Sequence, residues 1–317
     1  MNLVNDILIA EKRIKNHINH TAFDYSMKLS QITGAQVYLK CEHQQRTGSF
    51  KFRGAMNKIL SLNSEQLSKG VIAASTGNHG QGVALAGKIC NSPVTVYVPQ
   101  TASKLKVDAI KSWGAQILTV DGDCLAAEII ARDKANKTGM TFISPYNDQE
   151  VMAGQGTIGI EIAQQCQDLD VLFCVVGGGG LIGGIASYLK HVNPKIKIIA
   201  CCPQNAPAMY ECVKAGKIID VPELPTISDA TAGGVEPGSI TFEYCRDLID
   251  DYVLVSEDEI ANAMKTLAQT DSWMVEGAAA TTVAGLLKVG EQYKNKKVVV
   301  VLSGRNIALD KFLDIVK

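Results

Sequence analysis

The chain has 317 residues, of which 46% are apolar, enough to bury the core of one large domain or of two smaller ones. Its 31 basic and 32 acidic side chains leave a net charge of −1 without a long run of like charge, so we expect no nucleic-acid partner. The longest apolar runs are far shorter than the roughly 20 residues that cross a bilayer, and the first residues lack the basic start and apolar block of a secretory signal.

Short strand-like runs alternate with helix-like segments along almost the whole chain. Strands are expected at Val37–Glu42, Val71–Ser75, Pro93–Pro99, Gln116–Val120, Val171–Val176, Lys197–Pro203, Asp251–Ser256 and Lys297–Ser303. Helical spacing of apolar residues predicts helices at Gln81–Cys90, Ser103–Trp113, Leu125–Lys137, Gly156–Cys166, Asp258–Gln269 and Ala308–Val316. This alternation is typical of parallel sheets covered on both faces, so the predicted fold class is α/β.

Two of these units share one pattern, in which a strand opens onto a glycine-rich turn and then a helix. The first turn, Thr76–Gly82, follows the strand Val71–Ser75, and the second, Gly177–Gly184, follows Val171–Val176 about 100 residues later. The pattern predicts two sheets that face one cleft. The sequence contains no Gly/Ser-rich linker, so we expect the two parts to pack closely.

Cysteines and histidines do not indicate a disulfide framework or a metal site. The nine cysteines are odd in number and lack CxxC spacing, and several lie in apolar stretches, as do Cys90 and Cys174. They are interpreted as buried, reduced side chains of a cytoplasmic protein. The five histidines are dispersed, so no metal ligands are predicted.

The four consecutive glycines Gly177–Gly180 come at the end of a predicted buried strand. Such a turn lets the backbone approach a ligand closely, and its N–H groups, with the following helix N-terminus, suit a single phosphate. The motif is neither a Walker loop nor a dinucleotide fingerprint. The alternative is a tight turn that only packs a helix on a strand.

Lys51 stands between two aromatic residues, Phe50 and Phe52. Enclosure by apolar groups lowers the pKa of an amine, and a neutral amine is the nucleophile that imine formation needs. The alternative interpretation is an ordinary lysine with its ammonium group in water.

Two further strand ends carry small polar residues. Ser75–Gly80 combines hydroxyl and amide side chains at a strand-to-helix turn, where they can donate hydrogen bonds to a carboxylate or a phenolate oxygen, or simply cap the helix. Ser303 begins the string Ser303–Asn306 at the end of another buried strand, on the side of an open sheet where ligands bind. A cap for the helix Ala308–Val316 is the alternative there.

In this order the four motifs resemble the fold-type II pyridoxal phosphate enzymes, and among them the serine/threonine dehydratase (threonine ammonia-lyase) and serine racemase branch. The resemblance runs from about Ile14 to the end, on Lys40–Glu42, Thr47–Ala55, Ser75–Gly80, Ala153–Thr157, Gly177–Gly180 and Leu302–Asn306. It implies a two-domain fold like that of the tryptophan synthase β subunit, each domain an open, mostly parallel sheet flanked by helices. Residues 1–69 and 148–317 would form the large cofactor-binding domain, and residues 70–147 a small domain that contributes the loop for the substrate carboxylate.

The resemblance also implies pyridoxal 5'-phosphate as the cofactor and assigns residues to it. Lys51 would form the Schiff base and later take the Cα proton. Phe50 would lie against the pyridine ring, Asn78 would bind its phenolic oxygen, Ser303 would bind its nitrogen, Glu276 would lie near the ring edge, and Gly177, Gly178, Gly179, Gly180 and Leu181 would hold the phosphate. The substrate would contact Ser75, Thr76, Gly77 and His79 through its carboxylate, with Gly234 beside it.

The implied reaction is a β-elimination from a small β-hydroxy amino acid, giving a 2-keto acid and ammonia. A serine hydroxyl cannot hold the pyridine nitrogen protonated, so the ring is a weaker electron sink, and loss of a β-hydroxyl suits such a ring. The first alternative is a racemase of serine or another amino acid on the same scaffold. The non-enzymatic alternative, a catalytically silent protein that binds the cofactor, is disfavoured by the intact Lys51.

Three departures from the family pattern bear on the function. Thr76 stands where a racemase of this branch has a catalytic serine and many dehydratases have alanine, so its hydroxyl is a second candidate catalytic group. Cys202 and Ala208 replace acidic residues that bind a divalent cation in relatives, so no metal site is expected.

Arg305 is the third departure. It replaces a glycine of the family pattern and adds a positively charged guanidinium group at the mouth of the site. It could bind a second substrate carboxylate, as in 3-hydroxyaspartate or an ectoine-derived amino acid, or else point to solvent or pair with a structural acid. Because closed symmetric oligomers are common, a homodimer is the expected assembly.

Overall fold

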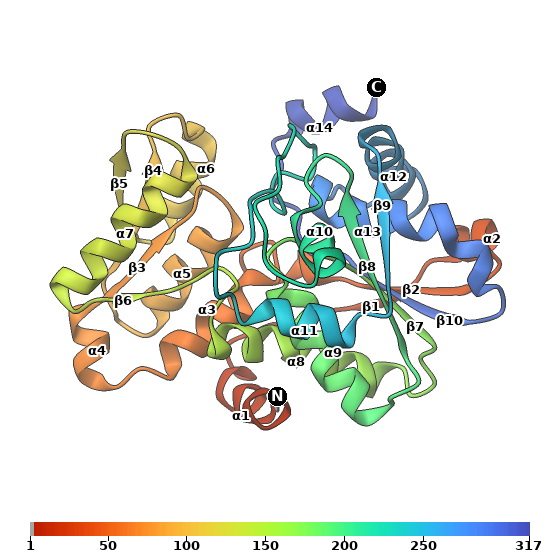
Figure 1. The fold of residues 1–317 in the computed structure, drawn as a ribbon, viewed down its shortest axis with the longest axis horizontal. Helices are drawn as coiled ribbons and strands as arrows, with labels where there is room; N and C mark the ends of the chain where they lie inside the picture. Colours follow the sequence, from red (N-terminus) through yellow and green to blue (C-terminus); the bar gives the residue numbers. More distant parts are fainter. Residues whose placement is uncertain (1–2) are drawn as a thin grey trace.

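The fold, seen in a computed structural model that describes residues 3–317 apart from the side chain of Leu105, contains two sheets that lie side by side (Figure 1). The larger sheet has the strand order β1-β2-β10-β7-β8-β9, and the smaller has the order β5-β4-β3-β6. Their strands are β1 (Phe23–Tyr25), β2 (Gln36–Lys40), β3 (Val71–Ala74), β4 (Val94–Pro99), β5 (Gln116–Val120), β6 (Thr141–Phe142), β7 (Val171–Val175), β8 (Lys197–Pro203), β9 (Asp251–Val255) and β10 (Lys297–Val301). All neighbours are parallel except β1 and β2 at one edge, which confirms the α/β class.

Helices connect the strands and cover the sheets. They are α1 (Val4–Ile14), α2 (Met27–Thr33), α3 (Lys51–Leu60), α4 (Ser64–Lys69), α5 (Asn78–Ile89), α6 (Lys104–Ser112), α7 (Cys124–Thr138), α8 (Gln149–Gln165), α9 (Gly180–Val192), α10 (Ala208–Ala215), α11 (Thr241–Leu248), α12 (Glu257–Thr270), α13 (Gly277–Val289) and α14 (Leu309–Val316), with 3-10 turns η1 (Glu42–Gln44) and η2 (Gly290–Tyr293). N-cap residues define where several of these helices begin. Asp148, for example, caps α8 by accepting a hydrogen bond from the Val151 N–H.

The larger sheet is buried on both faces because successive residues of its strands point to opposite sides. In β8, Ile199 and Cys201 pack under α12 and α13, whereas Ile198 and Cys202 pack under α8 and α9. The smaller sheet is covered in the same way, by α3, α5 and α6 on one face and by α7 on the other. The strands therefore read as continuous apolar runs in the sequence.

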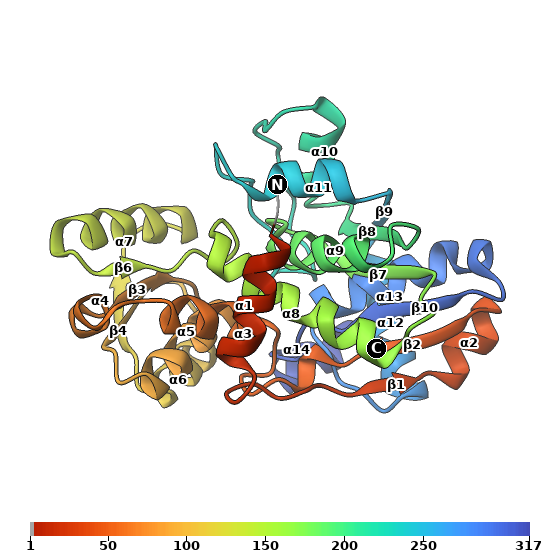
Figure 2. The same ribbon diagram turned by 90° about the horizontal axis from the view of Figure 1, so that it is seen from below.

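Helices α1, α3 and α8 lie between the two sheets (Figure 2). Helix α3 packs against α5 on one side and α8 on the other. A fully buried ion-pair cluster anchors it, because the Arg53 guanidinium donates to Glu42 at 2.8 Å and to Glu161 at 2.6 Å, and Lys40 pairs with Glu161. This cluster fixes the start of α3, and therefore Lys51, relative to β2 of the larger sheet and to α8.

The predicted strands are all present, each within a residue or two of its expected ends. The short strands β1 and β6 were not predicted, because three and two residues are too few to show a pattern. Helix α8 begins at Gln149 rather than at Gly156. Its glycines are needed for packing, since a Cβ on Gly154 would lie 2.6 Å from the Gly54 Cα.

The domain boundaries at residues 70 and 147 stay a prediction, although all strands of the smaller sheet lie between residues 71 and 142. Among residues 3–317, no helix combines the length and the apolar character of a membrane span.

Candidate active site

A cleft of about 620 Å³ lies between elements of the two sheets. Its walls come from the turn after β3, the start of α6, the segment 227–229, the start of α13 and the segment 305–308. Thr76, Glu276, Arg305 and Asn306 are among the lining residues. The segments that follow β3 and β10 therefore meet at one opening, whereas the glycine turn after β7, which the paired pattern placed at the same cleft, is not among its lining residues.

Lys51 is the first residue of α3, and its half-buried amine donates a hydrogen bond to the Pro145 carbonyl at 2.7 Å. No carboxylate pairs with this amine among the described residues. Burial lowers the pKa of Lys51 to about 8, partly opposed by the negative charge of Glu276. The amine also lies 5.2 Å from the centre of the Phe50 ring, so it has the enclosed setting of a nucleophile.

The glycine turn after β7 is packed too closely to accept side chains. A Cβ on Gly178 would lie 2.4 Å from the Tyr146 ring, and one on Gly177 would lie 2.8 Å from the Thr231 carbonyl oxygen. Gly179 has a φ of +86°, which favours glycine. The first hydrogen bond of α9 runs from the Gly183 N–H to the Gly179 carbonyl, so the preceding N–H groups are free to bind an anion.

The segment Pro145–Tyr146 connects this turn with the lysine. Pro145 accepts the hydrogen bond from the Lys51 amine, and the adjacent Tyr146 packs on Gly178 and Gly180. The Lys51 amine and the glycine turn Gly177–Gly180 therefore contact the same short segment, Pro145–Tyr146. Neither residue was a candidate from the sequence, because no local pattern marks a carbonyl or a packing ring as part of a site.

Ser303 lies two residues beyond β10, with 1% of its surface exposed. Its Oγ is one of four buried hydroxyl oxygens without a hydrogen-bond partner among the described residues, together with those of Thr47, Ser49 and Thr282. The Ser303 carbonyl accepts the Phe50 N–H at 3.1 Å, so the segment that carries this hydroxyl is tied to the segment before Lys51. A helix cap does not explain Ser303, since α14 begins only at Leu309.

Asn78, Glu276 and Asn306 form a buried polar chain beside Lys51. The Asn78 amide donates to Glu276 at 2.7 Å and accepts from the Asn306 amide at 2.6 Å. Burial raises the pKa of Glu276 to about 7. Asn306 is a contact that sequence reasoning missed, although it stands three residues after Ser303 and its string had been singled out.

The turn Ser75–Gly80 opens onto the N-terminus of α5, where the first helical hydrogen bond runs from the Gln81 N–H to the Gly77 carbonyl. The N–H groups of Asn78, His79 and Gly80 precede that bond, so they are available for a carboxylate. The His79 imidazole, however, is buried and its Nε2 lies 2.8 Å from the Ile143 carbonyl. Any contact of His79 with a substrate therefore involves its backbone.

Two other candidates lie apart from this cluster or at its edge. Gly234 is on an exposed loop, with no atom of another segment within 4 Å of a Cβ position, and it does not line the cleft. Arg305 lines the cleft and is exposed, and its guanidinium has no ion-pair or hydrogen-bond partner among the described residues. Pairing with a structural acid, one alternative for Arg305, is thus not seen.

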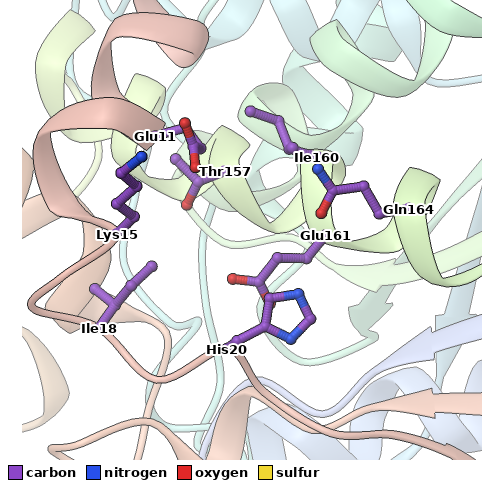
Figure 3. A pocket seen from close by; sticks show the side chains of 8 residues that line it. All are labelled: Glu11, Lys15, Ile18, His20, Thr157, Ile160, Glu161 and Gln164. Carbon is purple, nitrogen blue, oxygen red and sulfur yellow. The ribbon is translucent and has the colours of Figure 1, made fainter.

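A second cavity of only about 70 Å³ lies beside the buried ion-pair cluster (Figure 3). It has room for about two water molecules, each of which occupies roughly 30 Å³, and not for a cofactor. Its lining side chains come from α1, the segment that follows α1, and α8: Glu11, Lys15, Ile18, His20, Thr157, Ile160, Glu161 and Gln164. Among the described residues no three His, Cys, Asp or Glu side chains cluster as metal ligands, and Cys202 and Ala208 lie in the apolar core.

The family model described as pyridoxal-phosphate dependent enzyme matches residues 14–304. The chain belongs to this family. An L-threonine ammonia-lyase of Thermotoga maritima is 42% identical over 302 residues, which cover 95% of this chain and 75% of that protein.

Solved structures give the same answer for the fold. The processed form of threonine deaminase isoform 2 from Solanum lycopersicum has a TM-score of 0.94 and 36% identity, covering 99% of this chain and 91% of that one. Maize serine racemase has a TM-score of 0.93 and 32% identity, covering 98% of this chain and 95% of that one. The expected fold-type II architecture is confirmed.

Pyridoxal phosphate is therefore the cofactor, and the residues present fit it. An enclosed amine at Lys51, a buried hydroxyl without a partner at Ser303, and a glycine turn at a helix N-terminus meet the three needs of this molecule, namely its aldehyde, its ring nitrogen and its phosphate.

Proposed function

We propose that this protein is an ammonia-lyase that converts L-threonine or L-serine into a 2-keto acid and ammonia. The observation that carries the proposal is the enclosed Lys51 amine, whose pKa is lowered to about 8 and which lies next to the glycine turn. The names of the similar proteins, an L-threonine ammonia-lyase and a threonine deaminase, support the same reaction. The β-hydroxyl leaves as water, and water re-enters when the nitrogen is released, so the net loss is ammonia.

Lys51 has two tasks in this proposal. When bound, pyridoxal phosphate supplies an aldehyde that bonds to amines and a ring that withdraws electrons from Cα. The neutral amine of Lys51 would hold the cofactor's aldehyde, and the same amine would accept the Cα proton of the bound substrate. A pKa of about 8 suits both tasks near neutral pH, because the free amine is present in quantity and is still basic enough to accept a proton.

The remaining cofactor contacts are assigned by their chemistry. The N–H groups of Gly177–Leu181 would hold the phosphate, Ser303 would donate to the ring nitrogen, and Phe50 would lie against the ring face. Asn78 binds the phenolic oxygen by exchanging its present hydrogen bond to Glu276. Gly234 remains in the proposal only as a residue that a movement of its exposed loop would bring to the substrate.

The substrate is held by its carboxylate at the N-terminus of α5. The N–H groups there attract an anion, and the Ser75 and Thr76 side chains lie on the same turn. Gly77 leaves space at this turn, since no atom of another segment lies within 4 Å of a Cβ position. Cα is thereby oriented toward Lys51.

The test is release of 2-keto acid from both enantiomers of threonine, serine, 3-hydroxyaspartate and 3-phenylserine, with the cofactor-loaded protein. We expect turnover of L-threonine or L-serine and none by Lys51→Ala. Absence of keto acid from every substrate, with the cofactor bound, would leave a catalytically silent binding protein.

Racemisation is the second candidate, because the Thr76 side chain lines the cleft and could exchange a proton on the face of Cα opposite Lys51. The likeness to maize serine racemase supports it. If Thr76 has this role, Thr76→Ala reduces formation of D-serine from L-serine much more than formation of pyruvate, as chiral chromatography would measure.

We further propose that the enzyme works in the cytoplasm as a homodimer. All nine cysteines are free and seven are buried, which suits a reducing compartment. Closed two-fold assemblies are the commonest for enzymes of this size.

A further inference from the structure

Arg305 presents an unpaired guanidinium to the cleft from a rigid base. Its N–H donates to the Gly48 carbonyl at 2.9 Å, and its carbonyl accepts the Ile307 N–H at 2.8 Å. The next side chain, Asn306, donates to the Thr47 carbonyl at 2.8 Å. The backbone of Arg305 is thus fixed on both sides, while its side chain is exposed and free to meet a ligand.

The other charges of the cleft do not neutralise Arg305. Lys106 and Lys311 share the single carboxylate of Asp229, at 3.0 and 3.2 Å. Glu276 is the other acid of the lining, and burial raises its pKa to about 7, so it is only partly ionised near neutral pH. Three cations therefore face fewer than two negative charges, and the cleft favours an anionic ligand.

We propose that Arg305 binds a second carboxylate, carried on the side chain of the substrate, and thereby extends the reaction to acidic β-hydroxy amino acids of the 3-hydroxyaspartate type. The inference rests on the proposed function, in which the α-carboxylate occupies the N-terminus of α5. Thr76 of that turn and Arg305 line the same cleft, which is the arrangement that the proposal requires. A guanidinium binds a carboxylate through two parallel hydrogen bonds, which the methyl group of threonine cannot form.

The kinetic test compares 3-hydroxyaspartate with threonine in the loaded enzyme. For Arg305→Ala we expect the ratio of the two kcat/KM values to fall roughly 10- to 100-fold, the effect of losing a charged hydrogen-bonded pair. Arg305→Lys keeps the positive charge but cannot form two parallel hydrogen bonds, so it should restore part of the ratio of the two kcat/KM values. The matched control Lys311→Ala removes another cleft cation, and we expect it to change the ratio by less than about threefold.

Two kinetic outcomes would overturn the proposal. Equal losses of kcat/KM on both substrates in Arg305→Ala would show that Arg305 does not bind the side-chain carboxylate of the substrate. An equal effect of Lys311→Ala would show that the general positive field, and not Arg305, sets the preference.

A binding measurement separates this inference from the proposed reaction, because it needs no turnover. Succinate carries two carboxylates and butyrate carries one, so calorimetry on the loaded enzyme should show succinate binding roughly tenfold more tightly. Arg305→Ala should abolish that difference. If no amino acid is turned over, the proposed function fails while this result still reports on Arg305, and equal affinities in the unsubstituted enzyme would refute its role.

Discussion

At the scale of single residues, Ser303 shows how a partner that is missing from the protein can mark a ligand contact. A buried hydroxyl without a hydrogen bond costs about 1–3 kcal/mol, so folded proteins seldom keep one without a use. The Ser303 Oγ is such a group, at the end of the strand beside Lys51. The ring nitrogen of the cofactor supplies the missing partner in our proposal.

For Ser303→Ala we therefore expect a loss of function without a loss of stability. The cofactor-free variant should be at least as stable to urea as the unsubstituted protein, because the substitution removes a buried hydroxyl without a partner and breaks no protein hydrogen bond. Its kcat for threonine should fall by about 10-fold or more, since the ring nitrogen loses its only proposed partner. A variant that is destabilised by several kcal/mol would show instead that the hydroxyl has a structural role.

Glu276 gives a pH-dependent prediction. Its pKa of about 7 in the folded protein lies above the usual value of 4.5, so the folded state holds the proton more tightly than the unfolded chain does. This contribution to stability is complete below pH 4.5 and is lost as the pH rises through 7. The loss amounts to on the order of 3 kcal/mol.

Glu276→Gln should remove that dependence, because the amide does not titrate. Urea unfolding of the two cofactor-free proteins at pH 5 and pH 8 is the measurement, and the gap between them should shift in favour of the variant at pH 8. Stability curves that stay parallel between these pH values would contradict a raised pKa.

Single residues also show what sequence can and cannot predict. Lys51 and Ser303 stand in short distinctive strings, and they lie at the start of α3 and two residues beyond β10, respectively. The partners Pro145 and Asn306 were missed because they contact Lys51 and Asn78 across 94 and 228 residues. Long-range pairing of this kind leaves no trace in local composition.

At the scale of elements, the glycine turn before α9 requires glycine for two separate reasons. Gly179 has a left-handed φ, and a Cβ there would also lie 2.7 Å from the Cys245 Sγ. Gly216, after α10, has a similar φ of +69° but open space around it. Comparing substitutions at Gly179 and Gly216 therefore distinguishes the effect of backbone strain from the effect of a steric clash with neighbouring atoms.

We expect both Gly179→Ala and Gly216→Ala to lose about 1 kcal/mol or more of stability, because alanine resists a positive φ. Only Gly179→Ala should also weaken binding of pyridoxal phosphate, measured by fluorescence titration of the cofactor-free protein. If Gly216→Ala weakens cofactor binding equally, the effect comes from general destabilisation and the assignment of the phosphate turn fails.

Elements with a strong pattern were also the ones the sequence could locate. The apolar runs of β7, β8 and β10 are buried on both faces, so every residue contributes to the signal. Helix α8 was predicted too short, because glycines usually weaken helices. Here the glycines of α8 allow α3 and α9 to pack closely against α8, a requirement that exists only in the folded molecule.

At the scale of the whole molecule, the candidate site exists only because distant segments converge. Contacts join the segments 46–54, 75–80, 145–146, 177–181, 276 and 303–306, which come from both sheets and the helices around them. Figures 1 and 2 show the two sheets and the helices between them. The buried cluster around Arg53 holds that arrangement, since it joins α3 to α8 and to the end of β2. Eight of the ten described strands could be located from the sequence, but their order within the two sheets could not, and the site residues were brought together only by the resemblance.

The most direct test of the account is the position of the covalent link to the cofactor. The protein is loaded with pyridoxal 5'-phosphate, reduced with borohydride, digested and mapped by mass spectrometry. We expect one modified peptide, with the cofactor mass on Lys51, and no adduct in Lys51→Ala. A reduced adduct on another lysine, or none on the loaded protein, would contradict the central role of this amine.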